Sequence, residues 1–459
     1  MTDMTNQTRR RMLGQAALSG LAGAAWLTAS AEAAPSAPPH SAAPHPSASL
    51  SVLDFGARGD GKTDNTIAFQ KALDAAHARG GAVVSVPAGR FLFKGHLTIP
   101  PNTTLEGVGR APAPVPDPGM TVLMPTEGKG QMDGPAFLTM VGSVPTLKGL
   151  MILYPEQDPH AAEPTPYPWT IVQQGGQNLT VRDVTLLNPY QGINLTQAGR
   201  HFLSGIYGQP LALGIYVDQC YDVGRIENVH FWPFWNVDLN SPVVKWVNAH
   251  GVGMRFGRTD WQYVFNTFCF GYNIGYHFVQ TKDGLCNGNF VGIGSDSSGD
   301  AIVVENVEPF CGVQITNGEF VGMVRPDSQG LVVRDTNMGP VTLQNCAFWG
   351  PSDHIGTLRG SGPVTLTACN FSDWDKNNRG EPAFVVEGGG ATISHSQFLK
   401  CGTQDPAHKV AARIGSGCAS AVMLGNTLQG NAFRVVGPAR PDPSRYQIAM
   451  NVIQTVAAK

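Results

Sequence analysis

Residues able to carry charge or move protons recur at one position of a short repeated segment. The repeats are four-residue runs (GINL, GIYV, GMRF, GYHF and AIVV) that align without gaps at 192–195, 214–217, 253–256, 275–278 and 301–304. Their third position holds in turn an amide, a phenol, a guanidinium, an imidazole and an alkyl group, from Asn194, Tyr216, Arg255, His277 and Val303. The first four kinds of group can bind an anion and transfer protons when they stand side by side.

The residue after each run adds carboxylates to this polar row. Asp218 follows the second run and Glu305 follows the fifth, so they border Arg255 and His277 on either side. Neighbouring strands in register lie about 4.8 Å apart, which would let all these groups contact one ligand. With Asp260 from the segment after the third run, they form our candidate catalytic set: Asp218, Asp260, Arg255, His277 and Glu305. The alternative is that these charges only cover a solvated outer face.

The spacing of the runs identifies the element that must position these residues. Three more runs follow at 330–333, 355–358 and 383–386, and the eight runs are separated by 22, 39, 22, 26, 29, 25 and 28 residues. One short strand every 20 to 30 residues or so is typical of a solenoid. Because side chains alternate faces along a strand, the second and fourth residues should point inward and the third outward. The inward row then contains Val217, Phe256, Phe278 and Val304.

The outward row changes character along the solenoid. After His277 it continues as Val303, Val332, Thr357 and Val385, which offer little chemistry. We therefore expect the ligand to bind over residues 192–283, and the later coils to serve as scaffold. Arg334 and Arg359, which follow later runs, could extend the groove as outer subsites.

A second strand in each coil ends in a bulky apolar residue, as in GRIENVHF and VTLQNCAF. Asparagines precede that residue by three positions in several coils, at 228, 287, 317 and 345. Stacked asparagine side chains stabilise β-structure through hydrogen bonds between layers, so we assign Asn228, Asn287, Asn317 and Asn345 a structural role.

The 39-residue interval contains an insertion with helix signals. Ser241 can cap a helix, Pro242 suits its first turn and Gly251 can end it. A short helix is therefore predicted here, beside the face that carries Arg255.

Composition excludes several classes of protein. The chain has 55 Gly, 34 Pro and only 14% charged residues, which fits many tight turns and argues against a helical protein. A formal charge of −3 with no basic stripe argues against nucleic-acid binding. Among the eight cysteines, Cys346 and Cys369 fall at the same place in neighbouring coils, so we expect mostly free, buried thiols. The chain has no CxxC pair, so a zinc site is not expected.

The N-terminal sequence predicts an export signal. TRRRML at 8–13 resembles the twin-arginine motif, an apolar run follows at 16–29, and AEA at 31–33 fits a cleavage site. We predict a signal peptide at 1–33, a Pro/Ser/Ala linker at 34–49 and a periplasmic or extracellular protein with no membrane span after cleavage.

The segment 52–91 predicts a strand, a Gly-rich turn, a helix over 64–79 and another strand. Within it, DFGARGDGKTDNTIAFQKALDAA resembles the N-terminal signature of the pectate-lyase superfamily, which includes polygalacturonase-related hydrolases, rhamnogalacturonases, mannuronan epimerases and phage tailspikes. The resemblance implies an all-β, single-stranded right-handed parallel β-helix with an N-terminal capping helix. We place a cap module at 50–110, the β-helix at 111–440 and a tail at 441–459. Asp54, Asp60 and Asp64 are interpreted as turn and cap residues.

The resemblance also implies a carbohydrate ligand. The expected activity is that of a glycoside hydrolase acting on a polysaccharide or oligosaccharide, with a uronate-containing chain as one candidate. A polysaccharide lyase or C5-epimerase and a non-catalytic glycan-binding β-helix remain as alternatives. The Asn-Thr-Asp, Asp-Asp, Gly-His-Gly and Arg-Ile-Lys motifs of polygalacturonases are absent, so no polygalacturonase catalytic residue is transferred by motif. No cofactor is expected, except calcium if the protein is a lyase.

Sugar rings bind to flat aromatic faces, and their carboxylates and hydroxyls bind to polar side chains. Side chains of these kinds near the polar row form our substrate-binding set: Asn194, Tyr216, Trp232, Trp235, Asp238, Arg258, Trp261, Lys282, Asp300 and Arg334.

Overall fold

The structure is a computed structural model that describes residues 49–109, 119–403, 405, 409–429, 432–435 and 442–453. The predicted signal peptide and all but the last residue of the predicted linker lie outside the described residues. Everything described belongs to one compact unit that starts at Ser47. Among the described helices, none is long and apolar enough to cross a membrane.

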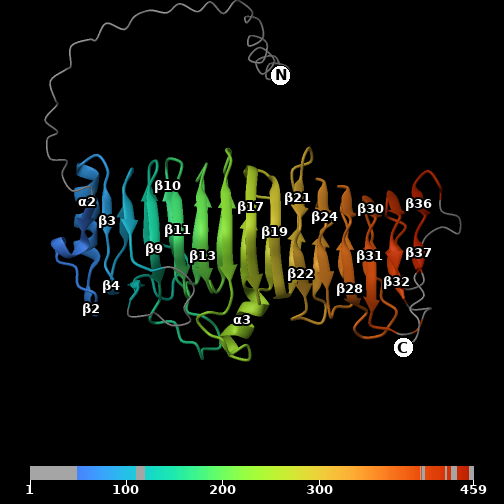
Figure 1. The fold of residues 1–459 in the computed structure, drawn as a ribbon, viewed down its shortest axis with the longest axis horizontal. Coiled ribbons are helices and arrows are strands. Elements are labelled where there is room, and N and C mark those ends of the chain that lie inside the picture. Colours follow the sequence, from blue (N-terminus) through green and yellow to red (C-terminus); the bar gives the residue numbers. More distant parts are fainter. Residues whose placement is uncertain are drawn as a thin grey trace, which may run out of the picture. The chain divides into compact units, whose positions relative to one another are not determined.

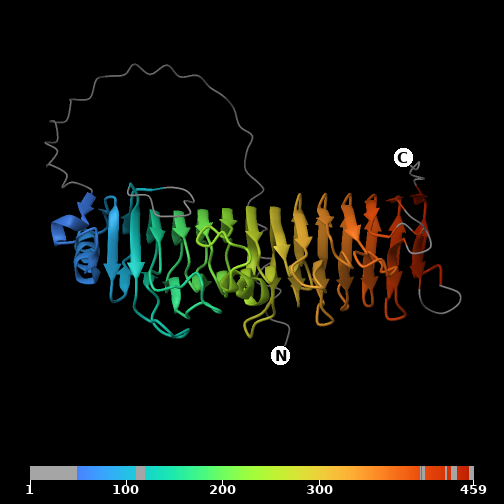
Figure 2. The same ribbon diagram turned by 90° about the horizontal axis from the view of Figure 1, so that it is seen from below.

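The chain winds into coils whose strands pair only with equivalent strands of the next coil, always in parallel (Figures 1 and 2). One described strand per coil joins a thirteen-stranded sheet, here called sheet B. Its strands are β5 (Leu97–Ile99), β8 (Leu138–Val141), β10 (Trp169–Gln174), β12 (Gln191–Thr196), β14 (Leu213–Asp218), β16 (Val252–Phe256), β18 (Ile274–Phe278), β20 (Asp300–Val304), β23 (Gln329–Val333), β26 (Gly356–Leu358), β29 (Phe384–Val386), β32 (Val410–Ile414) and β35 (Ala432–Val435).

The rest of each coil joins a second sheet, here called sheet A, which has 24 described strands. They are β1 (Ser49–Ser51), β2 (Asp60–Asp64), β3 (Val83–Ser85), β4 (Gly89–Phe93), β6 (Thr104–Glu106), β7 (Thr121–Pro125), β9 (Thr146–Ile152), β11 (Thr180–Leu186), β13 (Phe202–Gly208), β15 (Arg225–Phe231), β17 (Thr259–Phe270), β19 (Cys286–Ser298), β21 (Val313–Thr316), β22 (Glu319–Gly322), β24 (Val341–Gln344), β25 (Ala347–Trp349), β27 (Val364–Thr367), β28 (Asn370–Trp374), β30 (Gly390–Ser394), β31 (Gln397–Cys401), β33 (Ser420–Leu424), β34 (Thr427–Leu428), β36 (Tyr446–Ala449) and β37 (Val452–Ile453). The predicted parallel β-helix is confirmed.

The predicted alignment of the sheet-B strands is confirmed residue by residue. Tyr216 pairs with Asn194 on one side and with Arg255 on the other, and His277 lies between Arg255 and Val303. The four residues predicted to point inward are completely buried: Val217, Phe256, Phe278 and Val304. Phe256 and Phe278 stack with ring centroids 5.6 Å apart, so the core continues from coil to coil.

Sheet A bends at one residue per coil, and that residue has a positive φ. In consecutive coils the bend falls on Asn228 (φ 54°), Asn266 (φ 50°), Gly292 (φ 62°), Asn317 (φ 57°) and Asn345 (φ 52°). Asparagine and glycine tolerate this left-handed conformation better than other residues. The amide of Asn266 donates to Asn228 Oδ1, and the amide of Asn345 donates to Asn317 Oδ1, both at 2.8 Å.

The asparagine ladder was therefore predicted correctly at three of four positions. Asn287 is not part of it: its Oδ1 accepts from the Trp261 amide at 2.8 Å, and its Nδ2 donates to Asp260 Oδ1 at 2.9 Å. Asn287 lies near the start of the long strand β19, five residues before the bend at Gly292. Counting back from Phe290 misplaced the bend, because the register position of Phe231 is held by Cys269 in β17 and by Ser295 in β19, and Phe290 lies five residues earlier.

The predicted N-terminal helix is present as α2 (Thr66–Ala78), preceded by the 3-10 helix η1 (Val52–Phe55). Phe69 of α2 meets Phe91 and Phe93 edge-on, with ring centroids 5.3 and 4.9 Å apart, so α2 covers the end of the core. Asp60 is the first residue of β2 rather than part of a turn, and its Oδ1 accepts from the backbone of Lys62 and Thr63 at 2.9 and 2.8 Å.

Two predicted boundaries do not separate structural units. The strands of the predicted cap module are continuous with the β-helix, since β1, β3, β6 and β9 pair in succession. At the other end, β36 and β37 lie within the predicted tail and pair with β33 and β34. Both segments lack the four-residue pattern of sheet B, so the runs alone could not place them in the fold.

The insertion forms helix α3 (Pro242–His250), with Ser241 at its N-cap and Gly251 at its C-cap, as predicted. It lies below the strands in Figure 1, at the edge of sheet B where strands begin. Trp246 packs 6.0 Å from the ring of Tyr190, which precedes β12, and the Asn248 amide donates to the carbonyl of Gly271, which precedes β18. All eight cysteines are free, and seven are buried; Cys311 is exposed.

Candidate functional site

The polar row of sheet B is a continuous strip of side chains on four neighbouring strands. Asn194, Tyr216 and Arg255 are partly exposed, and His277 is 7% exposed. Each side chain comes from the same position of its strand, so neighbours in the row are separated by one strand spacing. The predicted juxtaposition of Arg255 and His277 is confirmed.

His277 is held by a carboxylate in one tautomer. Its Nε2 lies 2.8 Å from Glu305 Oε1. A carboxylate only accepts hydrogen bonds, so Nε2 carries the proton when the ring is neutral, and Nδ1 carries a lone pair. Nδ1 is buried and has no hydrogen-bond partner among the described residues. Burial and the charge of Arg255 lower the pKa of His277, which keeps the ring in its basic form.

Arg255 lies next to this base and is itself incompletely paired. Its Nε is buried and has no hydrogen-bond partner among the residues that the structure describes. Burial lowers the pKa of Arg255, yet a guanidinium in a protein stays charged near neutral pH. A partly buried cation with an unsatisfied donor favours binding of an anion such as a carboxylate.

Tyr216 stands on the other side of Arg255. Its hydroxyl donates to Asp218 Oδ2 at 3.1 Å, and its ring stacks against Trp169 at 6.3 Å. Burial and the Asp218 charge raise the pKa of Tyr216 far above its usual value, so the hydroxyl keeps its proton. The row thus places a base and a proton donor on either side of one cation.

Asp218 is more deeply embedded than its position suggested. It is 5% exposed, and its Oδ1 accepts from the Arg258 amide at 2.7 Å and the Thr281 hydroxyl at 3.0 Å. Together with the bond from the Tyr216 hydroxyl, the Asp218 carboxylate accepts three hydrogen bonds. Asp218 therefore does not simply cover a solvated outer face, the alternative considered above, and removing its charge would leave buried donors unpaired.

Arg258 and Asp260 form a close pair beside the strip. Two bonds join the guanidinium to the carboxylate, at 2.6 and 2.9 Å. The charges of Arg258 and Asp260 therefore neutralise each other. Trp261 follows with 63% of its surface exposed and a positive φ of 54°. Lys282 is exposed in the loop after β18. Trp261 and Lys282 are thus exposed enough to meet a large ligand.

Three predicted contact residues lie away from the strip. Trp232 is at the end of β15 in sheet A, and its ring packs 5.2 Å from Phe234 and 6.2 Å from Phe270. It does not lie near the polar row, where the substrate-binding set placed it. Trp235 packs against the core, with its amide bound to Gln209 Oε1 at 3.1 Å. Asp238 accepts from the Asn240 amide at 2.9 Å in the turn before α3.

Asp300 also has a structural partner. It is 6% exposed at the start of β20 and forms an ion pair with Arg325 at 2.9 Å. Arg334 directly follows β23, and its charge contributes to lowering the pKa of His277, so it lies within electrostatic reach of the base. Val303 and Val332 are 1% and 4% exposed, so this part of the row is covered rather than an open surface.

Sequence reasoning missed two positioning residues. Thr281 donates to Asp218 Oδ1, and its hydroxyl also accepts from the Asp283 amide at 3.2 Å. Gln219 donates to Asp283 Oδ2 at 2.8 Å. Both residues lie in loops, where the alternation of side chains along a strand does not predict which way a side chain points.

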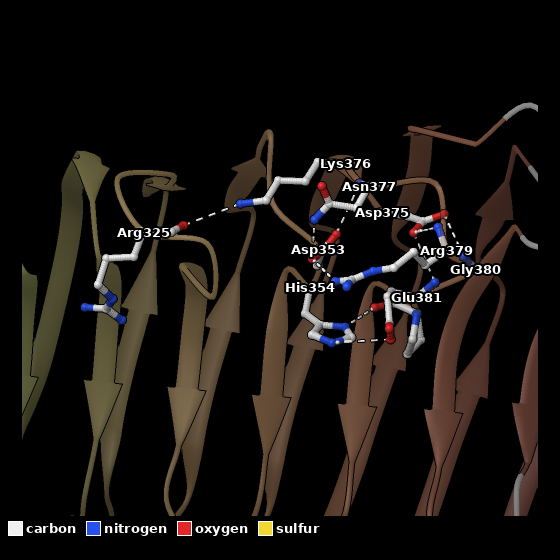
Figure 3. Close-up of polar contacts among 10 residues, drawn as sticks. Arg325, Asp353, His354, Asp375, Lys376, Asn377, Arg379, Gly380 and Glu381 are labelled. Carbon is white, nitrogen blue, oxygen red and sulfur yellow. Dashed lines mark hydrogen bonds and ion pairs between the residues drawn. The ribbon is translucent and has the colours of Figure 1, made fainter.

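A polar cluster in the later coils was missed as well (Figure 3). Asp353 accepts from Arg379 at 2.6 Å and from the Asn377 amide nitrogen Nδ2 at 2.8 Å, and His354 lies 3.6 Å from Glu381. A cavity of about 340 Å³ adjoins it. Its side chains are bonded to one another across the loops that precede β26 and β29, so we interpret the cluster as a connection between coils. No group of three or more His, Cys, Asp or Glu that could hold a metal ion occurs among the described residues.

Known proteins resemble this chain most clearly at its start. Residues 49–123 match the family described as "Rhamnogalacturonase A/epimerase, pectate lyase-like", which confirms the resemblance read from the sequence over that segment. Mannuronan C5-epimerase AlgE3 of Azotobacter vinelandii is 47% identical over 67 residues, 13% of this chain and 4% of that protein. The chain thus spans only a small fraction of the curated relatives it matches.

Solved structures resemble the whole β-helix. DFA-IIIase from Arthrobacter chlorophenolicus A6 has a TM-score of 0.53 at 13% identity, covering 90% of this chain and 99% of that one. The N-terminal fragment of bacteriophage phi29 gene product 12 has a TM-score of 0.55 at 14% identity, covering 84% of this chain and 67% of that one. At such identities the likeness establishes the right-handed parallel β-helix and nothing about the reaction.

Proposed function

We propose that this chain is a carbohydrate-active enzyme that removes the C5 proton of a uronate within a polysaccharide. The active site is the strip of sheet B around Arg255 and His277. One observation carries the proposal. His277 Nδ1 has a free lone pair and Arg255 Nε has no hydrogen-bond partner among the described residues, and the two side chains are neighbours on one face of sheet B. A base next to a carboxylate-binding cation is what abstraction of a proton α to a carboxylate requires.

In the proposed reaction, Arg255 binds the uronate carboxylate and stabilises the negative charge that develops when the C5–H bond breaks. His277 Nδ1 accepts the proton, and Glu305 stabilises the resulting imidazolium through Nε2. Tyr216, on the far side of Arg255, holds a proton that can be donated. If that proton goes to O4, the C4–O4 bond breaks, a C4–C5 double bond forms and the enzyme is a lyase. If the Tyr216 proton is instead delivered to C5 from the face opposite to His277, the C5 configuration is inverted and the enzyme is a C5-epimerase.

Glycoside hydrolysis, the activity first expected from the sequence, stays as a second candidate. It needs two carboxyl groups about 5–9.5 Å apart. Asp218 and Glu305 belong to strands three spacings apart, roughly 14 Å, which is too far. Asp283 lies nearer to Asp218, because its backbone amide donates to the Thr281 hydroxyl that donates to Asp218, and its carboxylate accepts from Gln219, the residue after Asp218. The buried, fully bonded state of Asp218 counts against its service as acid or base.

The test is a product assay on alginate, polygalacturonate and neutral polysaccharides. Unsaturated ends detected by ultraviolet absorbance identify a lyase, inverted C5 stereochemistry in proton NMR spectra identifies an epimerase, and new saturated reducing ends identify a hydrolase. Calcium was expected only for a lyase, so each assay is run with and without a chelator.

The variant His277→Ala is expected to abolish activity, with Arg359→Ala as the matched control on the same sheet. Wild-type turnover by His277→Ala would refute the proposed site. Saturated reducing ends that depend on Asp218 and Asp283 would move the assignment to the hydrolase.

A further inference from the structure

A second cavity lies on the outer surface of sheet A, away from the strip of sheet B. It follows the bend of four neighbouring strands, β11, β13, β15 and β17, three of which are labelled in Figure 1. The bend residues form its floor: Asp183, Gly205, Asn228 and Asn266. Its volume is about 570 Å³. We call it the bend groove.

Polar groups of both signs line one wall of the bend groove. Arg182, Ser204 and Glu227 occupy one register row, just before the bend. The Ser204 hydroxyl donates to Glu227 Oε1 at 2.9 Å, and Arg182 Nε lies 3.4 Å from Asp183 Oδ2. The row therefore holds a guanidinium, a hydroxyl and a carboxylate along one line; Arg182 is exposed, Glu227 is partly exposed and Ser204 is 9% exposed.

Rings line the opposite wall. Tyr207 and His230 are register partners just after the bend, and His230 is followed in β17 by Phe268. The His230 and Phe268 rings meet edge-on at 5.4 Å. In the row before the bend, the register partner of Glu227 in β17 is Phe265, which is 54% exposed. At β17 the lining of the groove includes Phe268, and Phe265 is exposed beyond it.

The glycine on the floor contributes depth. A Cβ at Gly205 would lie 2.8 Å from Asp183 Oδ1, and Gly205 has a φ of 67°. A larger residue at this position would therefore both strain the backbone and fill the groove.

We propose that the bend groove is a second carbohydrate-binding site, which takes a neutral segment of a glycan. Flat aromatic faces suit the CH faces of sugar rings, and the polar wall can both donate to and accept from their hydroxyls. The lining carries one guanidinium against two carboxylates, so it does not attract a polyanionic chain. This distinguishes it from the Arg255 strip, to which we assign a uronate. The inference does not depend on the proposed reaction.

Isothermal titration calorimetry with cellohexaose, maltohexaose, xylohexaose and a hexamer of galacturonate tests the proposal. At least one neutral hexamer should bind the full chain with a Kd of roughly millimolar or tighter. Glu227→Ala and Phe268→Leu should weaken that binding about tenfold or more, which is about 1.4 kcal/mol. Thr316→Ala lies in the same register row, three coils further along, and should bind as wild type.

His277→Ala should also leave this binding unchanged, which separates it from the proposed active site. Absence of binding by every neutral hexamer would overturn the inference. So would loss of binding in His277→Ala with retention in Glu227→Ala, or tighter binding of the galacturonate hexamer at the groove. If Phe268→Leu fails to fold, Glu227→Ala decides alone, because its side chain lies at the surface.

Discussion

The chemistry assigned to His277 depends on a single contact that no sequence pattern reveals. Strand phase predicts that His277 and Arg255 are neighbours and that Glu305 lies one coil away, and all three placements are found. The alternation of side chains along the strands cannot predict which ring nitrogen of His277 Glu305 contacts. That detail, together with the burial of Nδ1, makes His277 a base rather than a histidine with both nitrogens bonded.

Replacing Glu305 with Gln should therefore slow turnover and move its pH dependence. Glu305 raises the pKa of His277, while burial and Arg255 lower it. Without the carboxylate the pKa of His277 falls further, so the acid limb of the kcat/KM profile should shift to lower pH. We expect kcat to drop by about ten- to a hundredfold, because the imidazolium loses its partner. A pH profile unchanged in Glu305→Gln would show that His277 is not the titrating base.

Replacing Asp218 with Asn should affect stability as well as activity. Asp218 accepts three hydrogen bonds while 5% exposed, and an amide can accept at only one of its two terminal atoms. The loss should be about 1–3 kcal/mol in the free energy of unfolding, measured by denaturant titration. Asp283→Asn is the control, as Asp283 is partly exposed and should cost less than about 1 kcal/mol. Equal stabilities for the two variants would contradict this account.

At the scale of the elements, the alternation of side chains in the four-residue runs was sufficient to place the sheet-B strands. Helix signals in the sequence were sufficient to place α2 and α3. Sheet A was harder to place. From Asn228 to Asn345 the left-handed residue lies three residues before one register position, but that position holds Cys269 in β17 and Ser295 in β19, so counting back from a bulky residue fails there. Asn287 was misassigned for this reason, while Asn266, a true member of the ladder, was overlooked. Trp232 was misplaced because its loop connects the two sheets.

The bend column also contains a residue that does not suit its conformation. Ala368 occupies the bend one coil after Asn345 and has a φ of 54°. A left-handed alanine costs roughly 1–2 kcal/mol relative to glycine, which has no Cβ. Ala368→Gly should therefore raise the free energy of unfolding by up to about 1 kcal/mol, after the extra entropy of glycine in the unfolded chain is subtracted. The matched control, Ala347→Gly in β25, should be destabilising, and the same sign for both would argue against strain at the bend.

At the scale of the whole molecule, stability should decline with mild acid because of a histidine far from the proposed chemistry. His201 is completely buried, with Nδ1 2.8 Å from the Ala198 carbonyl and Nε2 3.2 Å from the Gln262 amide. Burial lowers the pKa of His201 from 6.5 to about 4. Between these values the unfolded chain binds a proton that the folded chain does not, so stability is complete above pH 6.5 and falls as the pH is lowered towards 4.

Between pH 7 and pH 5 the His201 contribution should amount to about 2 kcal/mol in the free energy of unfolding. His201→Gln removes the titration and should flatten the pH dependence by that amount, whatever its effect at pH 7. His250→Gln, at the exposed end of α3, should keep the wild-type slope. A slope that is the same in all three proteins would assign the acid sensitivity to other groups.

Along the whole stack of coils, the position of the reaction separates the roles of the charged residues. Arg255 lies beside His277 and its Nε has no partner among the described residues, whereas Arg359 lies several coils away and is bound to Glu387 at 2.7 Å. A short oligosaccharide that fills the Arg255 strip cannot reach Arg359, since each strand adds about 4.8 Å. We therefore expect His277→Ala to abolish turnover of short and long substrates alike. Arg359→Ala should leave the short ones unchanged and raise KM only for long ones, by a few-fold, because an exposed ion pair contributes little energy. Loss of turnover on the shortest substrate in Arg359→Ala, with His277→Ala still active, would place the active centre in the C-terminal coils.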